Sequence, residues 1–466
     1  MRQETMRPAV GRSFTPLPKF LKLVIYQLLL LMATVIGLAY GLYFSDLFFP
    51  TTRFSIWADI LVVLKYVWLV PLPYALLNFY SFVRYPVFLR SAPSNEPMHL
   101  PCKIYVRIVT RGLNLKLIGE TASNAEAALR AVLPLDQWHV EIVTDNPVST
   151  DYESTQLSVI AVPAVYQPSG GAKYKARALH YALSHTSATW EDWVVHLDEE
   201  THFSEDTVRA ICRFILQQRA DVAAGKRRFP RIGQGVILYG RRKIVNWITT
   251  LADSIRVGDD YGRFRLQYEH GRAGFGIHGS FIVINQGVET RVGFDHGPAA
   301  SITEDAYFAL MAQHLGVEFG FIHAYMDEKS PFTLFDFVRQ RRRWFGGLWL
   351  CALERKLPLS ERLPLLTFMV LWSVSWLCIL LVYVNLLYPT GTPVWLATVG
   401  GVSFAYYVTL YIIGFMQTFP RGTPNYWRLL MLQIVLIPIF SLMEAAGVFY
   451  GLIKPPGDFY IVKKEA

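Results

Sequence analysis

Long segments without a charged residue, at both ends of the chain, are the feature that most constrains its fold. Residues 23–44, 365–388 and 389–420 contain no charged side chain. A helix of about 20 apolar residues is long enough to cross the hydrocarbon core of a bilayer. We therefore predict a membrane protein in which apolar helices flank a middle region of different character.

The N-terminal region, residues 1–90, is predicted to be a transmembrane hairpin. Its second apolar segment, residues 56–82, contains Asp59 and Lys65 near its start, and we expect these charges to pair or to snorkel towards the membrane surface. Basic residues lie before the first segment and after the second. The positive-inside tendency therefore places both ends of the hairpin, and the region that follows it, in the cytoplasm.

The C-terminal region, residues 361–466, contains three apolar segments, and the last of them covers residues 429–453. Glu444 lies within this segment, and an acid at such a depth is expected to contact a polar substrate or to pair inside the bundle. Three crossings would place Lys454 and the lysines after it outside, against the positive-inside tendency. The number of crossings stays open, with a re-entrant or interfacial segment as one solution.

Composition supports a mixed architecture. Of the 466 residues, 52% are hydrophobic and only 17% are charged, which is too apolar for an ordinary soluble enzyme and too polar for a pure membrane bundle. The net charge of +9 does not indicate nucleic acid, because much of the excess lies beside apolar segments, where it suits anionic lipid headgroups. The four scattered cysteines form no CxxC pair, so no zinc site is predicted.

The middle region, residues 91–325, has the pattern of a cytosolic α/β domain. Residues 103–112 and 138–146 are predicted strands, residues 121–133 a helix, and residues 193–198 a buried strand. The second strand ends at a polar residue, Asp145. Strands that alternate with helices pair in parallel, so their polar ends meet at one edge of the sheet and predict a single site there.

Three carboxylates follow the strand at 193–198 directly. Asp198, Glu199 and Glu200 would repel one another unless a cation lies among them, and the spacing of Asp198 and Glu200 suits one hard divalent ion that could hold a diphosphate. The alternative is a helix N-cap, with Thr201 or an acid beginning the helix that follows.

Glycines, basic residues and aromatic residues mark three further segments. Residues 170–183 open a helix with basic first turns, which suits a phosphate or is an ordinary solvated face. Residues 245–256 have helical spacing and lie on the membrane face or in the core. Residues 274–284 are glycine-rich and permit close contact with a ligand, or form a plain bulge.

Two segments near the C-terminal end of the middle region carry acids and arginines. Residues 301–316 form a well-delimited helix in which Thr303 is the expected N-cap and Gly316 the end. Glu304 and Asp305 in its first turn either complement the helix dipole or supply a general base. Residues 326–360 are predicted to form an interfacial amphipathic helix, in which aromatic residues and arginines contact lipid headgroups.

These signals occur in a characteristic order along the chain: Asp145, Asp198–Glu200, Thr303–Asp305 and Gln340-x-x-Arg343-Trp344. Over residues 82–360, and in its flanking helices, the chain resembles the family 2 inverting glycosyltransferases of the cellulose synthase-like group. Within that group it is most similar to the egghead-type β-1,4-mannosyltransferases, through residues 175–179, 196–201, 249–256 and 329–333. The resemblance implies a GT-A α/β domain, with a mostly parallel sheet and flanking helices, embedded between transmembrane helices.

The resemblance also implies roles for individual residues. Asp305 would be the catalytic base, with Glu304 beside it. Asp198 and Glu200 would bind Mg²⁺ or Mn²⁺, although glutamate in a position where aspartate is commoner leaves open whether Glu199 or Glu200 reaches the metal. Contacts to the donor and its nucleotide would come from Asp145, Thr110, Arg111, Lys175, Arg177, Gln340, Arg343 and Trp344. Contacts to the acceptor would come from His278, Gly279 and Trp344.

The function implied is direct displacement at an anomeric carbon, with inversion. The favoured hypothesis is a multi-pass membrane enzyme, with its catalytic domain facing the cytoplasm, that moves mannose from GDP-mannose to a lipid-linked or glycolipid acceptor. One alternative is a processive polysaccharide synthase that uses a UDP-sugar. Another is a membrane transporter or structural protein with a soluble module. Membrane lipids are expected partners, and nucleic acid is not.

Overall fold

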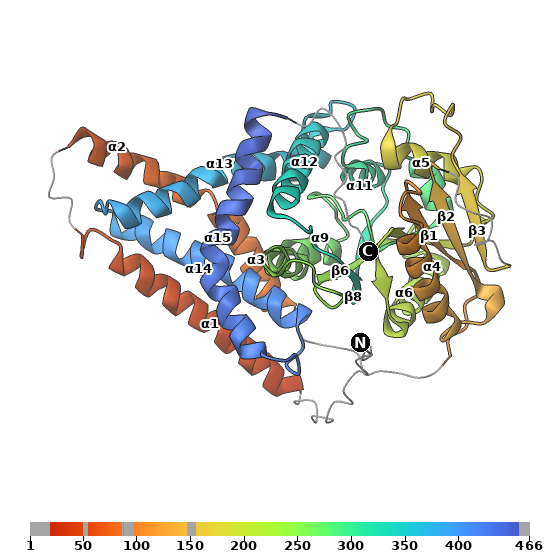
Figure 1. Ribbon diagram of the computed structural model, residues 1–466, viewed down its shortest axis with the longest axis horizontal. Coiled ribbons are helices and arrows are strands. Elements are labelled where there is room, and N and C mark those ends of the chain that lie inside the picture. The colour runs from red at the N-terminus through yellow and green to blue at the C-terminus, as the bar shows by residue number, and fades with distance from the viewer. Residues whose placement is uncertain (1–18, 50–54, 86, 88–96, 147–154, 456–466) are drawn as a thin grey trace, which may run out of the picture.

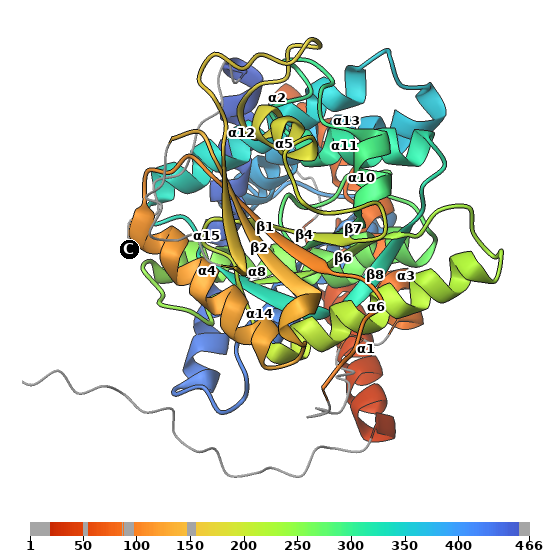
Figure 2. The same ribbon diagram turned by 90° about the vertical axis from the view of Figure 1, so that its right-hand side faces the viewer.

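The computed structural model describes residues 19–49, 55–85, 87, 97–146 and 155–455. A sheet region covered by helices forms one part of the molecule, and a set of long helices extends away from it (Figure 1). Figure 2 shows the sheet region from its outer side, with helices on both of its faces.

Within the described residues, the sheet has eight strands in the order β3-β2-β1-β4-β7-β6-β8-β5. Strands β3, β2, β1 and β4 are parallel, β7 is antiparallel to both of its neighbours, and β6 is parallel to β8. The strands are β1 Ile104–Thr110, β2 Trp138–Thr144, β3 Leu157–Ala161, β4 Trp193–Asp198, β5 His202–Phe203, β6 Ile232–Tyr239, β7 Ile282–Asn285 and β8 Phe319–Glu328. The prediction of a mostly parallel sheet with flanking helices is confirmed.

The central strands are continuous apolar runs because both faces of the sheet are covered. Successive residues of β2 and β4 point into two separate cores: Ile142 and Val195 into one, Val143 and Val194 into the other. The covering helices are α4 Leu115–Arg130, α5 Tyr174–Leu183, α6 Glu205–Ala223, α10 Gln286–Val292 and α11 Glu304–His314.

Element boundaries correct several expectations. Helix α4 begins six residues before its predicted start, because the Asn114 side chain accepts a hydrogen bond from the Leu117 amide and caps the helix there. The helix after the three carboxylates has Ser204 at its N-cap, and not Thr201. The predicted end of the α/β domain at residue 325 falls inside β8, which continues to Glu328 because its last four residues, Tyr325 to Glu328, pair with β6 after an irregularity in the register.

The predicted helix at 245–256 is two short helices, α7 Trp247–Ala252 and α8 Ser254–Asp259. Residues Thr249–Ala252 are buried, which places this segment in the core. Gly414 brings α14, Val394–Thr418, so close to α8 that a Cβ there would lie 1.7 Å from the Ser254 carbonyl oxygen. The segment therefore joins the sheet region to the long helices.

Five apolar segments in the described part of the chain are long enough to cross a membrane, as expected for a membrane protein. They are α1 Lys19–Tyr43; the segment of α2 Ile56–Leu64, η1 Lys65–Leu69 and α3 Leu72–Arg84; α13 Leu359–Leu387; α14 Val394–Thr418; and α15 Tyr426–Ile453.

Lys65 neither pairs with Asp59 nor snorkels, which contradicts both expectations for it. Its side chain is buried, and its Nζ donates to the carbonyl oxygen of Thr390, at 2.6 Å, and to the hydroxyl of Thr392, at 2.9 Å. A buried ammonium requires acceptors, and the turn between α13 and α14 supplies them. Glu444 pairs internally, with Arg341 at 2.8 Å. This is one of the two alternatives that the sequence left open for it.

Helices α1 and α14 approach each other through glycines. Gly37 and Gly41 form a small-xxx-small pair on α1, and a Cβ at Gly401 of α14 would lie 2.3 Å from the Gly37 carbonyl oxygen. Close backbone approach of this kind is a common basis of helix association in membranes.

We expect Gly401→Ala to destabilise the protein by about 1–3 kcal/mol, because the added methyl group forces the two helices apart. Thermal unfolding of the detergent-solubilised protein measures the effect. The neighbouring Gly400→Ala is the matched control, since a Cβ there meets Trp68 at an ordinary 3.6 Å. Equal melting temperatures for the two variants would contradict the packing argument.

Candidate active site

The polar ends of three neighbouring strands meet at one edge of the sheet. Thr110 ends β1, Asp145 follows β2 and Asp198 ends β4. Helix α5 begins above this edge, and helix α11 begins beside it (Figure 1). Parallel strands place ligand sites at their carboxyl ends, and the residues predicted to form the site are gathered there.

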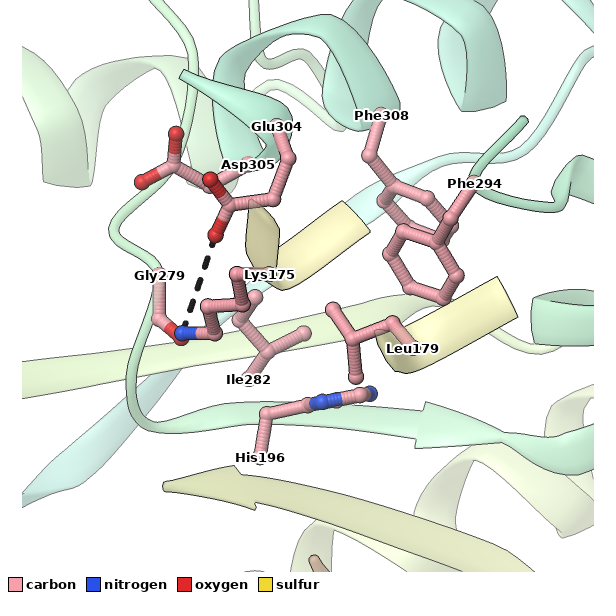
Figure 3. Close-up of a pocket in the computed structure, with 9 residues that line it drawn as sticks. All are labelled: Lys175, Leu179, His196, Gly279, Ile282, Phe294, Glu304, Asp305 and Phe308. Atoms are coloured by element: carbon pink, nitrogen blue, oxygen red, sulfur yellow. Dashed lines mark hydrogen bonds and ion pairs between the residues drawn. The ribbon is translucent and has the colours of Figure 1, made fainter. Parts of the chain in front are cut away.

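Lys175, in the first turn of α5, is the central cation of this cluster. Its Nζ lies 2.5 Å from Asp198 Oδ1, 2.8 Å from the Gly279 carbonyl oxygen and 3.7 Å from Glu304 Oε1. Figure 3 shows its ammonium directed towards Glu304 and Gly279, above an apolar floor that includes Leu179. Burial alone would lower the pKa of Lys175, but the carboxylates of Asp198 and Glu304 outweigh burial and raise it, so the lysine stays charged.

The two acids at the start of α11 lie in different environments. Glu304 is buried, and burial, followed by the charge of Asp305, raises its pKa to about 7. Burial also raises the pKa of Asp305, and the backbone N–H of Ala306 opposes this shift. Asp305 is more exposed than Glu304, and both acids line the same cavity. Two carboxyl groups with different environments at one site are suited to different roles.

Thr303 occupies the predicted N-cap position of α11. Within the described residues its side chain caps no backbone amide and instead contacts the Sγ atom of Cys351 at 3.3 Å. Thr303 is therefore the N-cap, as predicted, although its hydroxyl is directed towards helix α12, Leu334–Leu353.

Gly279 allows Asp305 and Lys175 to approach the chain closely. A Cβ at this position would lie 3.1 Å from Asp305 Oδ2 and 3.3 Å from Lys175 Nζ. The neighbouring His278 contacts the carboxylate of Asp260 through Nε2, at 2.5 Å. Asp260 begins a π-helical turn, Asp260–Phe264, and such turns are frequent at functional sites. Sequence patterns did not reveal Asp260, because its partner is 18 residues away.

The two glutamates after Asp198 point in different directions. Glu199 Oε2 accepts a hydrogen bond from the Thr110 hydroxyl at 2.5 Å, which ties it to the end of β1. Glu200 is buried, and its negative charge opposes the lowering by burial of the pKa of Arg242 and Lys329. The Asp198 side chain is 40% exposed, whereas Glu200 is buried.

A divalent metal is compatible with these residues, provided that a substrate completes its ligand set. Within the described ranges, no three side chains from His, Cys, Asp and Glu are grouped so as to hold an ion. Mg²⁺ is commonly held by one or two carboxylates together with phosphates and water. Asp198, with Glu199 or Glu200 beside it, has the oxygen donors that such a site requires.

The predicted nucleotide contacts fall into one group. Asp145 Oδ1 lies 3.3 Å from Arg177 Nη2, which joins the end of β2 to α5. Arg111 is exposed, and its carbonyl oxygen accepts from the Asn146 side chain at 2.5 Å. Thr110 and Thr144 are partners in the register of β1 and β2, so these residues surround one corner of the site.

The three predicted residues of helix α12, Gln340, Arg343 and Trp344, have different surroundings. Burial lowers the pKa of Arg343, and the charges of Glu304, Asp305 and Asp198 partly oppose this shift. Arg343 therefore faces the acidic cluster. Gln340 instead accepts a hydrogen bond from Arg341 at 2.9 Å. Two guanidinium groups lie over the Trp344 ring: that of Arg256 is 4.4 Å from the ring centroid, and that of Arg341 is 4.5 Å from it. Arg343 alone of the three predicted residues is directed at the acids.

Below the site lies a buried charge network that the sequence analysis missed. Arg107 of β1 contacts Glu141 of β2 at 3.0 Å and Glu289 of α10 at 2.9 Å. Glu289 also lies 2.6 Å from His196 of β4, which is among the residues drawn in Figure 3. A detectable signal existed, since Arg107 and Glu141 occupy equivalent positions in two apolar strands.

A second buried network joins the site to the long helices. Arg341 contacts Asp253 at 2.7 Å and Glu444 of α15 at 2.8 Å. Both of these partners are distant from Arg341 in the sequence. Arg341 is followed in α12 by two further arginines, Arg342 and Arg343. The network therefore fixes α12 between α7, α8 and α15.

Comparisons with known proteins identify the relatives of this chain. Residues 193–419 match the family described as Glycosyl transferase family group 2. The chain is 34% identical over 430 residues to "Beta-1,4-mannosyltransferase egh" of Drosophila melanogaster, covering 89% of this chain and 90% of the relative. It is also 34% identical over 429 residues to "Beta-1,4-mannosyltransferase bre-3" of Caenorhabditis elegans, covering 88% and 89%.

Among solved structures, the chain is similar to "Mannosyltransferase PcManGT from Pyrobaculum calidifontis in complex with GDP-Man and Mn2+". The match has a TM-score of 0.48 and 14% identity, and it covers 85% of this chain and 98% of that one.

Removing the central cation of the lower network is expected to destabilise the protein strongly. Arg107→Met leaves two buried carboxylates without their partner, a change worth about 3–5 kcal/mol, and it should lower the melting temperature in detergent. Arg219→Met is the control, because its pair with the 76%-exposed Glu191 contributes about 0–1 kcal/mol. Similar losses in both variants would contradict a structural role for the network.

The pKa of Glu304 predicts a pH dependence of stability. Its folded-state pKa, about 7, lies above the ordinary 4.5, so the folded state binds the proton more tightly and loses stability as pH rises from 4.5 to 7. Melting temperature against pH should fall less steeply across this window in Glu304→Gln than in the unmodified protein. Parallel curves would show that Glu304 ionises without a penalty in the folded state.

Proposed function

Because the chain belongs to the egghead-type β-1,4-mannosyltransferases of glycosyl transferase family 2, we propose that it transfers mannose from GDP-mannose, in β-linkage, to a lipid-linked or glycolipid acceptor. The observation that carries the proposal is the arrangement around Lys175. It places a partly exposed acid, Asp305, beside cations that suit a diphosphate and beside Asp198.

The proposed reaction begins with the acceptor hydroxyl, which is a poor nucleophile until it loses its proton. Asp305 accepts this proton as the oxygen attacks the anomeric carbon from the face opposite the nucleotide. The bond from the anomeric carbon to the diphosphate breaks as the new bond forms, so an α-linked donor yields a β-glycoside. One inversion requires no covalent intermediate on the enzyme.

The donor is proposed to lie along the sheet edge, between α5 and α12. The pair of Asp145 and Arg177, with Thr110 and Arg111, surrounds the corner that we assign to the nucleotide. Lys175 and Arg343 face the acids and are positioned to stabilise the charge that develops on the leaving diphosphate. Gln340 is proposed to act through Arg341, its hydrogen-bond partner.

Asp198, with Glu199 or Glu200, is proposed to hold Mg²⁺ or Mn²⁺ against the diphosphate. A divalent cation bound there would neutralise phosphate charge and favour departure of the nucleotide. The exposed Asp198 carboxylate is the first ligand by its position, while Glu200 is buried.

The acceptor is proposed to approach from the side of the long helices. His278 and Gly279 border Asp305, and the Trp344 ring lies on α12 between the site and those helices. An acceptor with a lipid anchor can remain in the membrane while its sugar reaches the base. By the positive-inside tendency, we assign residues 91–325, together with the end of β8, to the cytoplasmic side.

Purified protein, incubated with a panel of radiolabelled nucleotide sugars and membrane lipid extract, tests the proposal. We expect one labelled sugar to be added from GDP-mannose, in a reaction that EDTA stops and Mn²⁺ or Mg²⁺ restores. Transfer only from a UDP-sugar, or formation of a polymer, would support the processive synthase instead. Absence of turnover with every donor would support the non-enzymatic alternative.

Asp305→Asn is expected to reduce the transfer rate by about 100-fold or more, since a general base contributes about 10²–10⁴. Retained binding of GDP and an unchanged melting temperature would show that the loss is chemical. Asp206→Asn, at a side chain that is 69% exposed on α6, is the matched control and should transfer normally. An active Asp305→Asn enzyme would remove Asp305 from the role of base.

A further inference from the structure

The start of helix α15 lies on the side of the catalytic region. The ring of Tyr426 packs against Phe415, near the end of α14, with 5.4 Å between centroids. The last turn of α14 is bound to the sheet region, because Arg241 donates to the carbonyl oxygens of Gln417 and Thr418. About two turns into α15, Gln433 donates to the Leu251 carbonyl oxygen of α7 at 3.2 Å.

The end of α15 lies on the same side. Arg342 of α12 donates to the carbonyl oxygens of Lys454 at 2.6 Å and Pro455 at 3.1 Å. Arg342 directly precedes Arg343, which faces the acidic cluster of the site. Gly451 allows close contact with Phe345, also on α12. Both ends of α15 therefore contact elements that belong to the catalytic side of the molecule.

The other apolar segments behave differently. Helices α1, α3, α13 and α14 extend together away from the sheet, whereas α15 runs across α13 and α14 (Figure 1). Their far ends are joined to one another, because the Asp46 amide and the Lys65 ammonium both bind the turn that contains Thr392. The midpoint of α15, Pro438, accepts a hydrogen bond from Tyr383 of α13 at 2.9 Å, so the helix rests on the bundle.

One face of α15 is apolar and exposed from end to end. Trp427 is 70% exposed, Val435 65% and Ile453 68%, whereas Ile437 and Phe440 on the other face are buried. A continuous apolar face of this length requires an apolar partner. Exposed basic residues, Arg428 and Lys454, stand at its two ends, where they suit anionic lipid headgroups.

We propose that α15 does not cross the membrane: both of its ends lie on the catalytic side, its middle reaches towards the far end of α13, where Tyr383 contacts Pro438, and its exposed face lies in the lipid. The remaining four apolar segments of the described chain are then the crossings. An even number returns the chain to its starting side, so Lys454 lies with the catalytic region, in agreement with the positive-inside tendency.

In this placement α15 contacts lipid with one face and is linked to the proposed donor site through Arg341 of α12. Glu444 of α15 and Asp253 hold Arg341 between them, and Arg341 is the hydrogen-bond partner of Gln340 and stacks on Trp344. The membrane leaflet thereby becomes one of the supports of α12. The inference does not depend on which sugar or acceptor the enzyme uses.

Labelling of single introduced cysteines in sealed vesicles tests the topology. The four native cysteines are buried, so the full-length chain serves as background. Arg428→Cys and Lys454→Cys report the two ends of α15. Glu191→Cys, on the sheet region and 76% exposed, and Phe48→Cys, in the turn after α1 and 63% exposed, report the two sides of the membrane. A membrane-impermeant maleimide is the probe.

We expect Arg428→Cys and Lys454→Cys to label together with Glu191→Cys, on the side opposite to Phe48→Cys. Labelling of Lys454→Cys with Phe48→Cys would show that α15 crosses, and would overturn the proposal. Detergent-solubilised protein should label at all four positions, which verifies their reactivity. If Lys454→Cys does not label in detergent, Ile453→Cys, at the adjacent exposed position, reports the same end.

Discussion

The ammonium of Lys175 is the interaction on which the site depends. Asp198 comes from the end of β4, Glu304 from the start of α11 and Gly279 from the approach to β7, and one cation contacts all three. Without it, several carboxylates would face one another at the edge of a sheet, and at least one of them would have to bind a proton. Lys175 therefore assembles an acidic site at this edge of the sheet.

Two buried networks hold this cluster in place from opposite directions. Arg107 joins β1, β2 and α10 beneath the site, and Arg341 joins α8, α12 and α15 beside it. Each arginine has two carboxylate partners, which compensates part of the desolvation of the charges. The catalytic region and the long helices consequently share charged residues, so the membrane part is a structural support of the site as well as an anchor.

Much of the fold could be predicted from local patterns. Apolar runs that end in polar residues located β1, β2 and β4 and the edge where Thr110, Asp145 and Asp198 meet. Boundaries and partners were harder. The early start of α4 depends on a single Asn114 cap, the break between α7 and α8 lies at Asp253, and Lys65 was assigned to the membrane surface although it is buried. Each of these outcomes depends on groups distant in the sequence, which periodicity cannot reveal.

By itself, the sequence determined that an α/β domain lies between apolar helices, which acids follow the strands, and which family the motifs resemble, because these depend on residue order and spacing alone. Tertiary structure alone decided which charges pair. It directed Arg343 but not Gln340 towards the acids, separated Glu304 from Asp305 by burial, and brought both ends of α15 to one side of the molecule. The physical reason is the same in each case: the energy of a buried charge or an exposed apolar face is set by its neighbours in space.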